Sequence, residues 1–147
     1  MTRDLRIRAA AAGEWPDIAS VLQQCGLAID AVEPGLNQFH VAILDGQLVG
    51  CAGGERYGET IVVTSVAVLA GFRDRGIASH LVWAVLTRAR ANSCRHAVLL
   101  STTCPSYFTR YGFSLCAVDK LPQEVLAAKA FRRRDGAPPL CMRCELK

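Results

Sequence analysis

Hydrophobic residues near the start of the chain first recur at every second position and then at helical spacing. Leu5 and Ile7 flank Arg6, and this period of two predicts a half-buried strand. Residues 14–25 carry apolar side chains three and four positions apart, which predicts a helix that ends at Gly26. We therefore expect the fold to open with a strand and then a helix.

Two short apolar runs predict a hairpin. Residues 39–44 and 48–52 are joined by Asp45 and Gly46, a dipeptide that favours the positive φ angles of a tight turn. This antiparallel pair is the clearest local prediction in the chain.

The middle of the chain predicts a strand, a loop and a long helix. Residues 53–58 are glycine-rich and predict a turn, whereas residues 60–68 are β-branched and apolar, as is typical of a central strand. An apolar stripe over residues 76–92 predicts a helix. Further apolar runs predict strands at residues 97–100, 113–117 and 140–145 and helices at residues 106–111 and 124–131. The order β-α-β-β-β-α-β-α-β-α-β predicts an α/β fold with a central mixed β-sheet flanked by helices on both faces.

Length and charge limit the classes of protein to consider. The chain has 147 residues, the size of one ordinary domain, so we expect residues 1–147 to form a single domain. Its net charge of +4 suits an anionic ligand or a solvated surface. No apolar run approaches the roughly 18 residues of a membrane span, and the charged start does not resemble a signal peptide. We expect a cytoplasmic protein that does not bind membranes.

The seven cysteines favour free thiols. Their number is odd, and they are spread over predicted strands and helices in a chain without an export signal. Cys141 and Cys144 have the two-residue gap of a zinc half-site, but no second pair of cysteines or histidines follows. We therefore expect no metal, and a cysteine-based metal binder is a minor alternative.

The loop between the central strand and the long helix has the features of a phosphate site. The first amides of a helix have no partner inside it, and the helix dipole favours an anion there. Arg73 and Arg75 add positive charge, and Gly76 lets the backbone approach a ligand. Gly76 is not followed by the Lys-Ser/Thr of a Walker loop, and Gly71 with Gly76 cannot supply the three glycines of a dinucleotide fingerprint. A nucleotide triphosphatase and a Rossmann domain are both disfavoured.

The spacing of Arg73, Gly76 and Ala78 resembles the R/Q-x-x-G-x-G/A motif of the GNAT N-acetyltransferases. Residues 107–113 resemble a later segment of that family, of the type FY-x-x-x-GF. The chain is most similar to the GNAT branch associated with arsenic resistance and, more loosely, to the acetyltransferase domain of bacterial N-acetylglutamate synthases. The segments that carry this narrower resemblance are residues 45–50, 55–58, 99–103 and 121–122. The resemblance implies a GNAT-like single domain.

Acetyl-coenzyme A is the co-substrate that the resemblance implies. In the family, backbone amides of the central strand hold the pantetheine, and the glycine loop holds the pyrophosphate. The positions that correspond to cofactor-binding residues are Val66, Ala67, Val68, Arg73, Asp74, Arg75, Gly76, Ile77, Ala78, Ser79 and Phe108.

Acetyl transfer to an amine requires a base for the ammonium proton and a polarised thioester carbonyl. Glu55 and Glu59 flank the central strand and are the candidate bases, Glu55 ahead of Glu59. Many family members protonate the leaving thiolate with a tyrosine four residues before the glycine of the GF pair, but Phe108 occupies that position here. Solvent or the departing ammonium can supply this proton, since a thiol has a pKa of about 8.5.

Polar residues late in the chain suggest the acceptor. Candidate substrate-binding residues are Ser101, Thr102 and Thr103, which can donate hydrogen bonds, and Arg132, which can clamp a carboxylate. They suit direct attack by the primary amine of a small, amino-acid-like anion. A GNAT acting on a protein or aminoacyl-tRNA amine, and a non-catalytic coenzyme A sensor, remain open alternatives. We expect no nucleic-acid partner, because basic and aromatic residues are not interleaved. The oligomeric state is open, with a homodimer as one alternative.

Overall fold

The computed structural model describes residues 4–27, 37–73, 75–101, 108–109, 111–116, 121, 125 and 140–146. The strands in these residues are β1 (Leu5–Ala9), β2 (Asn37–Leu44), β3 (Gln47–Tyr57), β4 (Thr60–Val68), β5 (His96–Ser101), β6 (Ser114–Leu115) and β7 (Leu140–Glu145). Within the same residues they form one sheet in the order β1-β2-β3-β4-β5-β7-β6. All neighbouring strands are antiparallel except β4 and β5, which are parallel. The predicted mixed sheet is confirmed.

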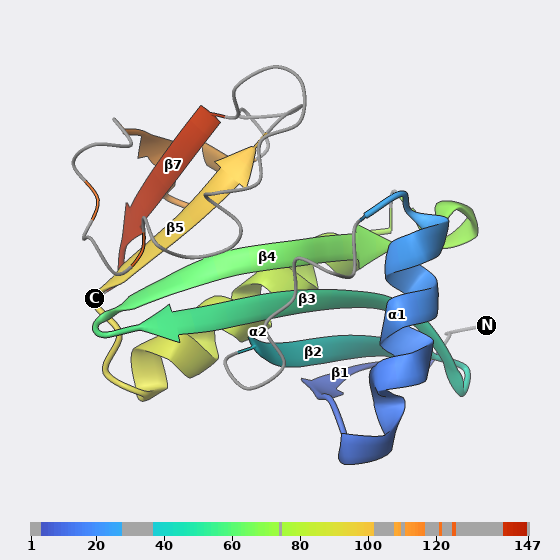
Figure 1. The fold of residues 1–147 in the computed structure, drawn as a ribbon. Helices are drawn as coiled ribbons and strands as arrows, with labels where there is room; N and C mark the ends of the chain where they lie inside the picture. The colour runs from blue at the N-terminus through green and yellow to red at the C-terminus, as the bar shows by residue number, and fades with distance from the viewer. Residues whose placement is uncertain are drawn as a thin grey trace.

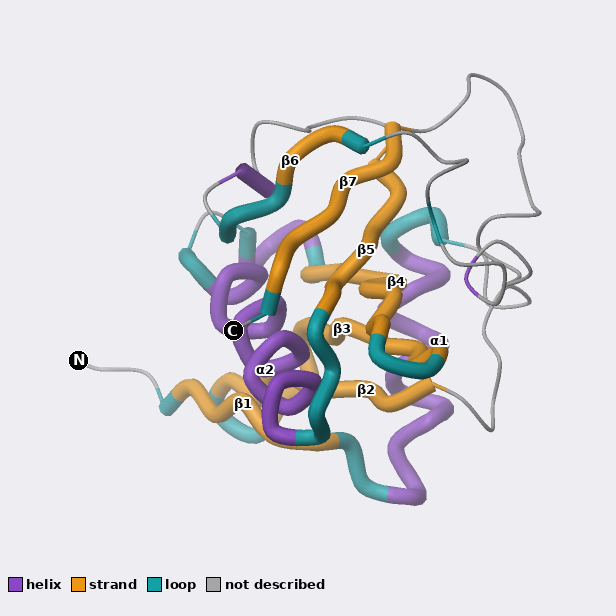
Figure 2. Tube along the Cα trace, turned by 90° about the vertical axis from the view of Figure 1, so that its left-hand side faces the viewer, coloured by secondary structure: helices purple, strands orange, loops and turns teal. Residues whose placement is uncertain are grey.

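Helices cover both faces of this sheet, as predicted. The helix α1 (Trp15–Gln24) lies on one face and α2 (Ile77–Ala91) lies on the other (Figures 1 and 2). Short 3-10 turns precede each helix, at Ala12–Glu14 and Ala70–Phe72. The buried residues of α1 are Ile18, Val21 and Leu22, whose spacing of three and four places them on one side of the helix. They pack against β2, β3 and β4, whereas the apolar side of α2 packs on the opposite face of the same strands.

The predicted turn over residues 53–58 is wrong. Instead, β3 continues as a regular strand to Tyr57, and the turn is confined to residues 58–59. A Cβ atom added at Gly54 would lie only 3.1 Å from Cγ1 of Val85 in α2. The glycine therefore allows the helix to pack close to the sheet. The local sequence alone does not show whether a glycine has this role or lies in a turn.

The other predicted elements largely agree with the structure. The predicted strands at residues 60–68 and 140–145 coincide with β4 and β7. The helix α2 begins and ends one residue inside the predicted range of residues 76–92. The predicted strand at residues 113–117 is shorter, because β6 has only Ser114–Leu115. None of the described helices combines the length and hydropathy that a membrane span requires.

Two predicted helices are described only in part. Residues 108–109, within the predicted helix 106–111, are helical, and so is Val125 within the predicted helix 124–131. Tyr111, at the end of the first predicted helix, lies in a turn instead. Residues 106–107, 110, 124 and 126–131 lie outside the described residues.

Candidate active site

The sheet opens between its two parallel strands. Over residues 60–62, β4 pairs with β5; beyond Val62, β4 continues along β3 while β5 continues along β7. Figure 1 shows the two strands diverging toward their carboxyl ends. In the described part of the chain, residues 63–68 of β4 therefore have no neighbouring strand on this side. We call the opening between these residues and β5 the wedge.

A bulge in β4 lies within the wedge. The register between β3 and β4 shifts so that Ser65 and Val66 lie opposite the single residue Ala52. Ser65 has a φ of 54°, a left-handed conformation that costs a non-glycine residue about 1–2 kcal/mol. Residues 64–66 are half-exposed in an otherwise buried strand. A bulge leaves its extra residue without a ladder partner, and strained residues cluster at functional sites, so the backbone of β4 is suited to contact a ligand in the wedge.

Gly76 begins the helix that follows β4. Its φ of +78° lies in the left-handed region, which glycine adopts without steric cost. The amide of His80 donates to the carbonyl of Gly76, so the amides of Ile77, Ala78 and Ser79 precede the hydrogen-bond ladder of α2. Together with the helix dipole, these amides form a site for an anionic group.

Two arginines border this helix start. Arg73 Nε donates to the carbonyl of Val68 at 2.9 Å, and its Nη2 lies 3.6 Å from Cys25 Sγ. The guanidinium of Arg75 lies over the ring of Phe72, 5.6 Å from its centroid. Within the described residues neither guanidinium forms an ion pair with a carboxylate. Both positive charges therefore suit an anion at the start of α2.

The segment around Phe108 docks on the same turn of α2. Tyr111 Oη donates to Ser79 Oγ at 2.6 Å, and the Tyr111 amide donates to the Phe108 carbonyl at 3.1 Å. The ring of Phe108 packs edge-on against Phe113, with 6.3 Å between the centroids. Phe108 is thus a half-buried packing residue beside the helix start and has no proton to donate.

Glu55 is a buried carboxylate beside the wedge. It lies in β3 directly opposite Val62, the last residue of β4 that pairs with β5. Its exposed fraction is 1%, and Tyr57 Oη donates to its Oε2 at 2.6 Å. Tyr57 packs against the apolar cluster that includes Val62 and Cys141, which fixes the position of its hydroxyl. The arrangement holds one carboxylate at the point where the wedge begins.

The second candidate base lies elsewhere. Glu59 is in the turn before β4, with 62% of its side chain exposed and Oε2 3.9 Å from Arg95 Nε. The structure therefore brings Glu55 to the wedge, together with Val66 and the start of α2, but not Glu59. The backbone of Ser101 ends β5 on the other side of the wedge. The predicted site residues Asp74, Thr102, Thr103 and Arg132 lie outside the described residues.

Sequence reasoning missed three partners of the site. Tyr57 contacts Glu55 because residues two apart in a strand share a face, a relation hidden by the wrong prediction of a turn. Tyr111 and Cys25 contact Ser79 and Arg73 across 32 and 48 positions of the chain. No local pattern signals such contacts, since they depend on how distant elements pack.

Cys141 and Cys144 do not form a chelating pair. They lie three positions apart in β7, so their side chains point to opposite faces of the sheet and join different apolar clusters. Cys141 Sγ lies 3.1 Å from Cys116 Sγ, and Cys144 Sγ donates to the Tyr111 carbonyl. No group of three or more histidine, cysteine, aspartate or glutamate side chains in the described residues could hold a metal ion.

Comparisons with known proteins agree with this geometry. The model of the Acetyltransferase (GNAT) family matches residues 6–113. An amino-acid acetyltransferase of Neisseria meningitidis is 27% identical over 126 residues, which cover 80% of this chain and 29% of the relative. One of Pseudomonas fluorescens is 26% identical over 112 residues, which cover 72% of this chain and 26% of the relative. The chain thus spans less than a third of these curated relatives.

Solved structures share the fold. The N-acetylglutamate synthase of Neisseria gonorrhoeae, in complex with coenzyme A and N-acetyl-glutamate, superposes with a TM-score of 0.79 at 22% identity, over 98% of this chain and 35% of that one. A GNAT-family acetyltransferase of Staphylococcus aureus has a TM-score of 0.77 at 16% identity, over 98% of this chain and 100% of that one. The family match confirms the predicted class, a domain of the acetyltransferase (GNAT) family. The wedge, the bulge and the arginine-glycine loop are therefore those of a member of the acetyltransferase (GNAT) family, to which this chain belongs.

Proposed function

We propose that the protein transfers the acetyl group of acetyl-coenzyme A directly to the primary amine of a small anionic amino acid. The observation that carries the proposal is a buried carboxylate, Glu55, at the point where β4 and β5 separate. The curated relatives are amino-acid acetyltransferases, which supports an amino acid as the acceptor. We also propose that residues 1–147 form one such domain. We propose that the protein acts in the cytoplasm, on a small molecule rather than a nucleic acid. A homodimer is one oligomeric state to test.

The start of α2 suits the pyrophosphate of the co-substrate. The amides of Ile77 to Ser79 precede the helical ladder, and the positive charges of Arg73 and Arg75 lie beside them. The pantetheine arm would then extend into the wedge, along the backbone of β4. We assign to the amide of Val66, at the bulge, a hydrogen bond to the thioester oxygen, which gains negative charge as the amine attacks.

Glu55 is the group that we assign as the base. It takes a proton from the acceptor's ammonium, directly or through a water, and the neutral nitrogen then forms a bond to the thioester carbon. The bond from that carbon to sulfur breaks, and the thiolate leaves with its electron pair. Since Phe108 has no acidic proton, the thiolate takes its proton from solvent or from the nitrogen that has just been acylated.

A coenzyme A release assay tests this proposal. Purified protein with acetyl-coenzyme A is offered a panel of acidic, neutral and basic amino acids, and free thiol is followed with time. We expect the acidic amino acids to give the highest kcat/KM. A preference for basic or neutral amines would contradict the anionic acceptor. Tight binding of acetyl-coenzyme A without faster release by any amine would contradict catalysis and favour a coenzyme A sensor.

A further inference from the structure

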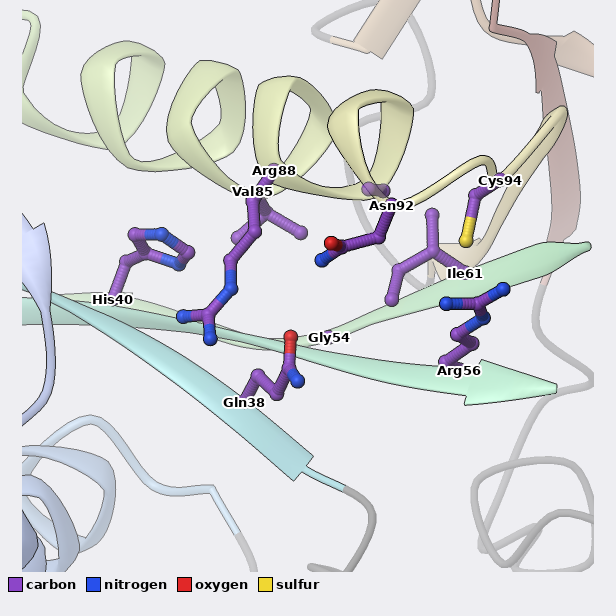
Figure 3. Close-up of a pocket in the computed structure, with 10 residues that line it drawn as sticks. Gln38, His40, Gly54, Arg56, Ile61, Val85, Arg88, Asn92 and Cys94 are labelled. Atoms are coloured by element: carbon purple, nitrogen blue, oxygen red, sulfur yellow. The ribbon is translucent and has the colours of Figure 1, made fainter.

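A small cavity lies between the second half of α2 and strands β2 and β3 (Figure 3). Its volume is about 40 Å³, enough for a few waters or one carboxylate group. Arg88, on its helical side, follows Gly76 by about 18 Å along the helix axis at a rise of ~1.5 Å per residue. The cavity is therefore remote from the start of α2, where the phosphates of the co-substrate are expected.

The cavity also faces away from Glu55. Gly54 and Arg56 line it from β3, and Glu55 between them points to the other face of the sheet because side chains alternate along a strand. A ligand in this cavity is thus separate from the acceptor amine in the wedge.

The polar side chains that line the cavity supply donors and positive charge. Arg88 and Arg56 are cationic, Gln38 and Asn92 carry amide donors, and none of the described lining residues is acidic. Figure 3 shows Arg88 and Asn92 extending from α2 toward the sheet and Gln38 extending from β2 toward the helix. In the described residues, no hydrogen bond or ion pair occupies the guanidinium of Arg88. Arg56 Nε already donates to the Gly58 carbonyl at 3.0 Å, so the groups that an anion would satisfy together are the Arg88 guanidinium and the two amides.

His40 provides an independent indication of a ligand. It is 7% exposed and lines the cavity from β2, and its Nδ1 is buried without a hydrogen-bond partner in the described part of the chain. Burial first, and the charge of Arg88 second, lower the pKa of the imidazole, so the ring is neutral at pH 7 and carries one N–H. Buried polar atoms in folded proteins nearly always have a hydrogen-bond partner, so we expect a bound ligand or water to supply one for this nitrogen.

We propose that this cavity binds the carboxylate group of a small organic anion. The guanidinium of Arg88 donates to the carboxylate oxygens, and His40 Nδ1–H donates to one of them. The amides of Gln38 and Asn92 contribute further donors. A planar carboxylate matches the fork of a guanidinium and fits the small volume better than a tetrahedral phosphate does.

Titration with acetate, followed by NMR, tests the proposal on the whole chain. The ring nitrogens of His40 and the Nε–H of Arg88 are observed while acetate replaces chloride at constant ionic strength. We expect saturable shifts of both signals with acetate, and much weaker shifts with inorganic phosphate. Phosphate binding equal to or tighter than acetate would overturn the choice of a carboxylate, and an absence of saturable shifts would overturn the site.

Arg88→Gln and Arg90→Gln form a matched pair. Each removes one positive charge from α2, but Arg90 is exposed and does not line the cavity. We expect Arg88→Gln to weaken acetate binding about 10- to 100-fold, as for loss of a charge-assisted hydrogen bond, and Arg90→Gln to leave it unchanged. Equal effects of the two variants would mean that only net charge matters and would refute the site. Unchanged melting temperatures and acetyl-coenzyme A affinity in both variants show that the fold is intact.

Discussion

Replacement of Tyr57 by phenylalanine should slow acetyl transfer, because it removes the hydrogen bond that fixes the carboxylate of Glu55. Tyr57 Oη donates to Glu55 Oε2 at 2.6 Å, and the carboxylate is 1% exposed. A hydrogen bond to a charged group is worth about 1.5–3 kcal/mol. If that energy holds the carboxylate in its reactive position, its loss lowers kcat by about 10- to 150-fold. The affinity for acetyl-coenzyme A should not change, because neither residue borders the start of α2.

A double-mutant cycle separates this role from a general loss of structure. Glu55→Gln alone should lower the rate of the chemical step by about 10²- to 10⁴-fold, as for removal of a general base. If Tyr57 acts through Glu55, then Tyr57→Phe should have almost no further effect in the Glu55→Gln protein. Glu59→Gln is the matched control, since it neutralises an exposed carboxylate in the adjacent turn and should retain wild-type turnover.

Single-turnover release of coenzyme A, with the co-substrate bound before the amine is added, measures the chemical step directly. Melting temperatures close to that of the wild type would show that the variants fold. Full turnover in Glu55→Gln, or loss of turnover in Glu59→Gln, would refute our assignment of the base. Additive effects of Tyr57→Phe and Glu55→Gln would refute the positioning role of Tyr57.

Three other predictions concern the phosphate loop, an ion pair and a buried thiol. Gly76→Asp should abolish the rise in melting temperature given by acetyl-coenzyme A, whereas Gly76→Asn, which tolerates the same φ of +78° without the charge, should retain part of it. Hydrogen bonds from Arg8 lower the pKa of Glu14 to about 2, so the pair stabilises the fold above about pH 4.5, and this contribution is lost as the pH falls through about 2. Because the pair is partly exposed, Glu14→Gln should lower the free energy of unfolding by only about 0.5 kcal/mol at neutral pH, with no difference from wild type near pH 2 in denaturant titrations. Burial raises the pKa of Cys51 to about 12, so a thiol alkylating reagent at pH 8, monitored by mass spectrometry, should label the half-buried Cys25 well before Cys51; equal rates would contradict the buried environment.

The sequence predicted those parts of the site that depend on neighbouring residues. Residues 60–68 and 76–92 have strong, uninterrupted patterns, and the loop between them joins a strand to a helix within a few positions. Such a connection places Arg73 and Gly76 near the start of a helix, and this placement does not depend on how distant elements pack. Local periodicity and helix-end chemistry are therefore sufficient to locate a helix start that suits an anion.

The wedge itself could not be predicted from those patterns. It exists because β4 leaves β5 after Val62, and pairing between distant strands determines where this happens. The left-handed conformation of Ser65 is equally hidden, since serine gives no local signal for a positive φ. Resemblance to a family supplied the expectation that the central strand holds the pantetheine, and only the pairing register locates the wedge in this chain.

The misassigned segment at the end of β3 explains why a base can be held on a glycine-rich stretch. Gly54 and Arg56 face α2, while Glu55 and Tyr57 face the other side of the sheet. A side chain at Gly54 would meet Val85, so α2 rests directly on the strand at this point. The helix thereby supports the backbone from one face, and the hydroxyl of Tyr57 holds the carboxylate of Glu55 on the other. Glu55 is thus positioned by a packed strand rather than by a mobile turn, which is what a base requires if its carboxylate is to meet each incoming amine in one fixed geometry.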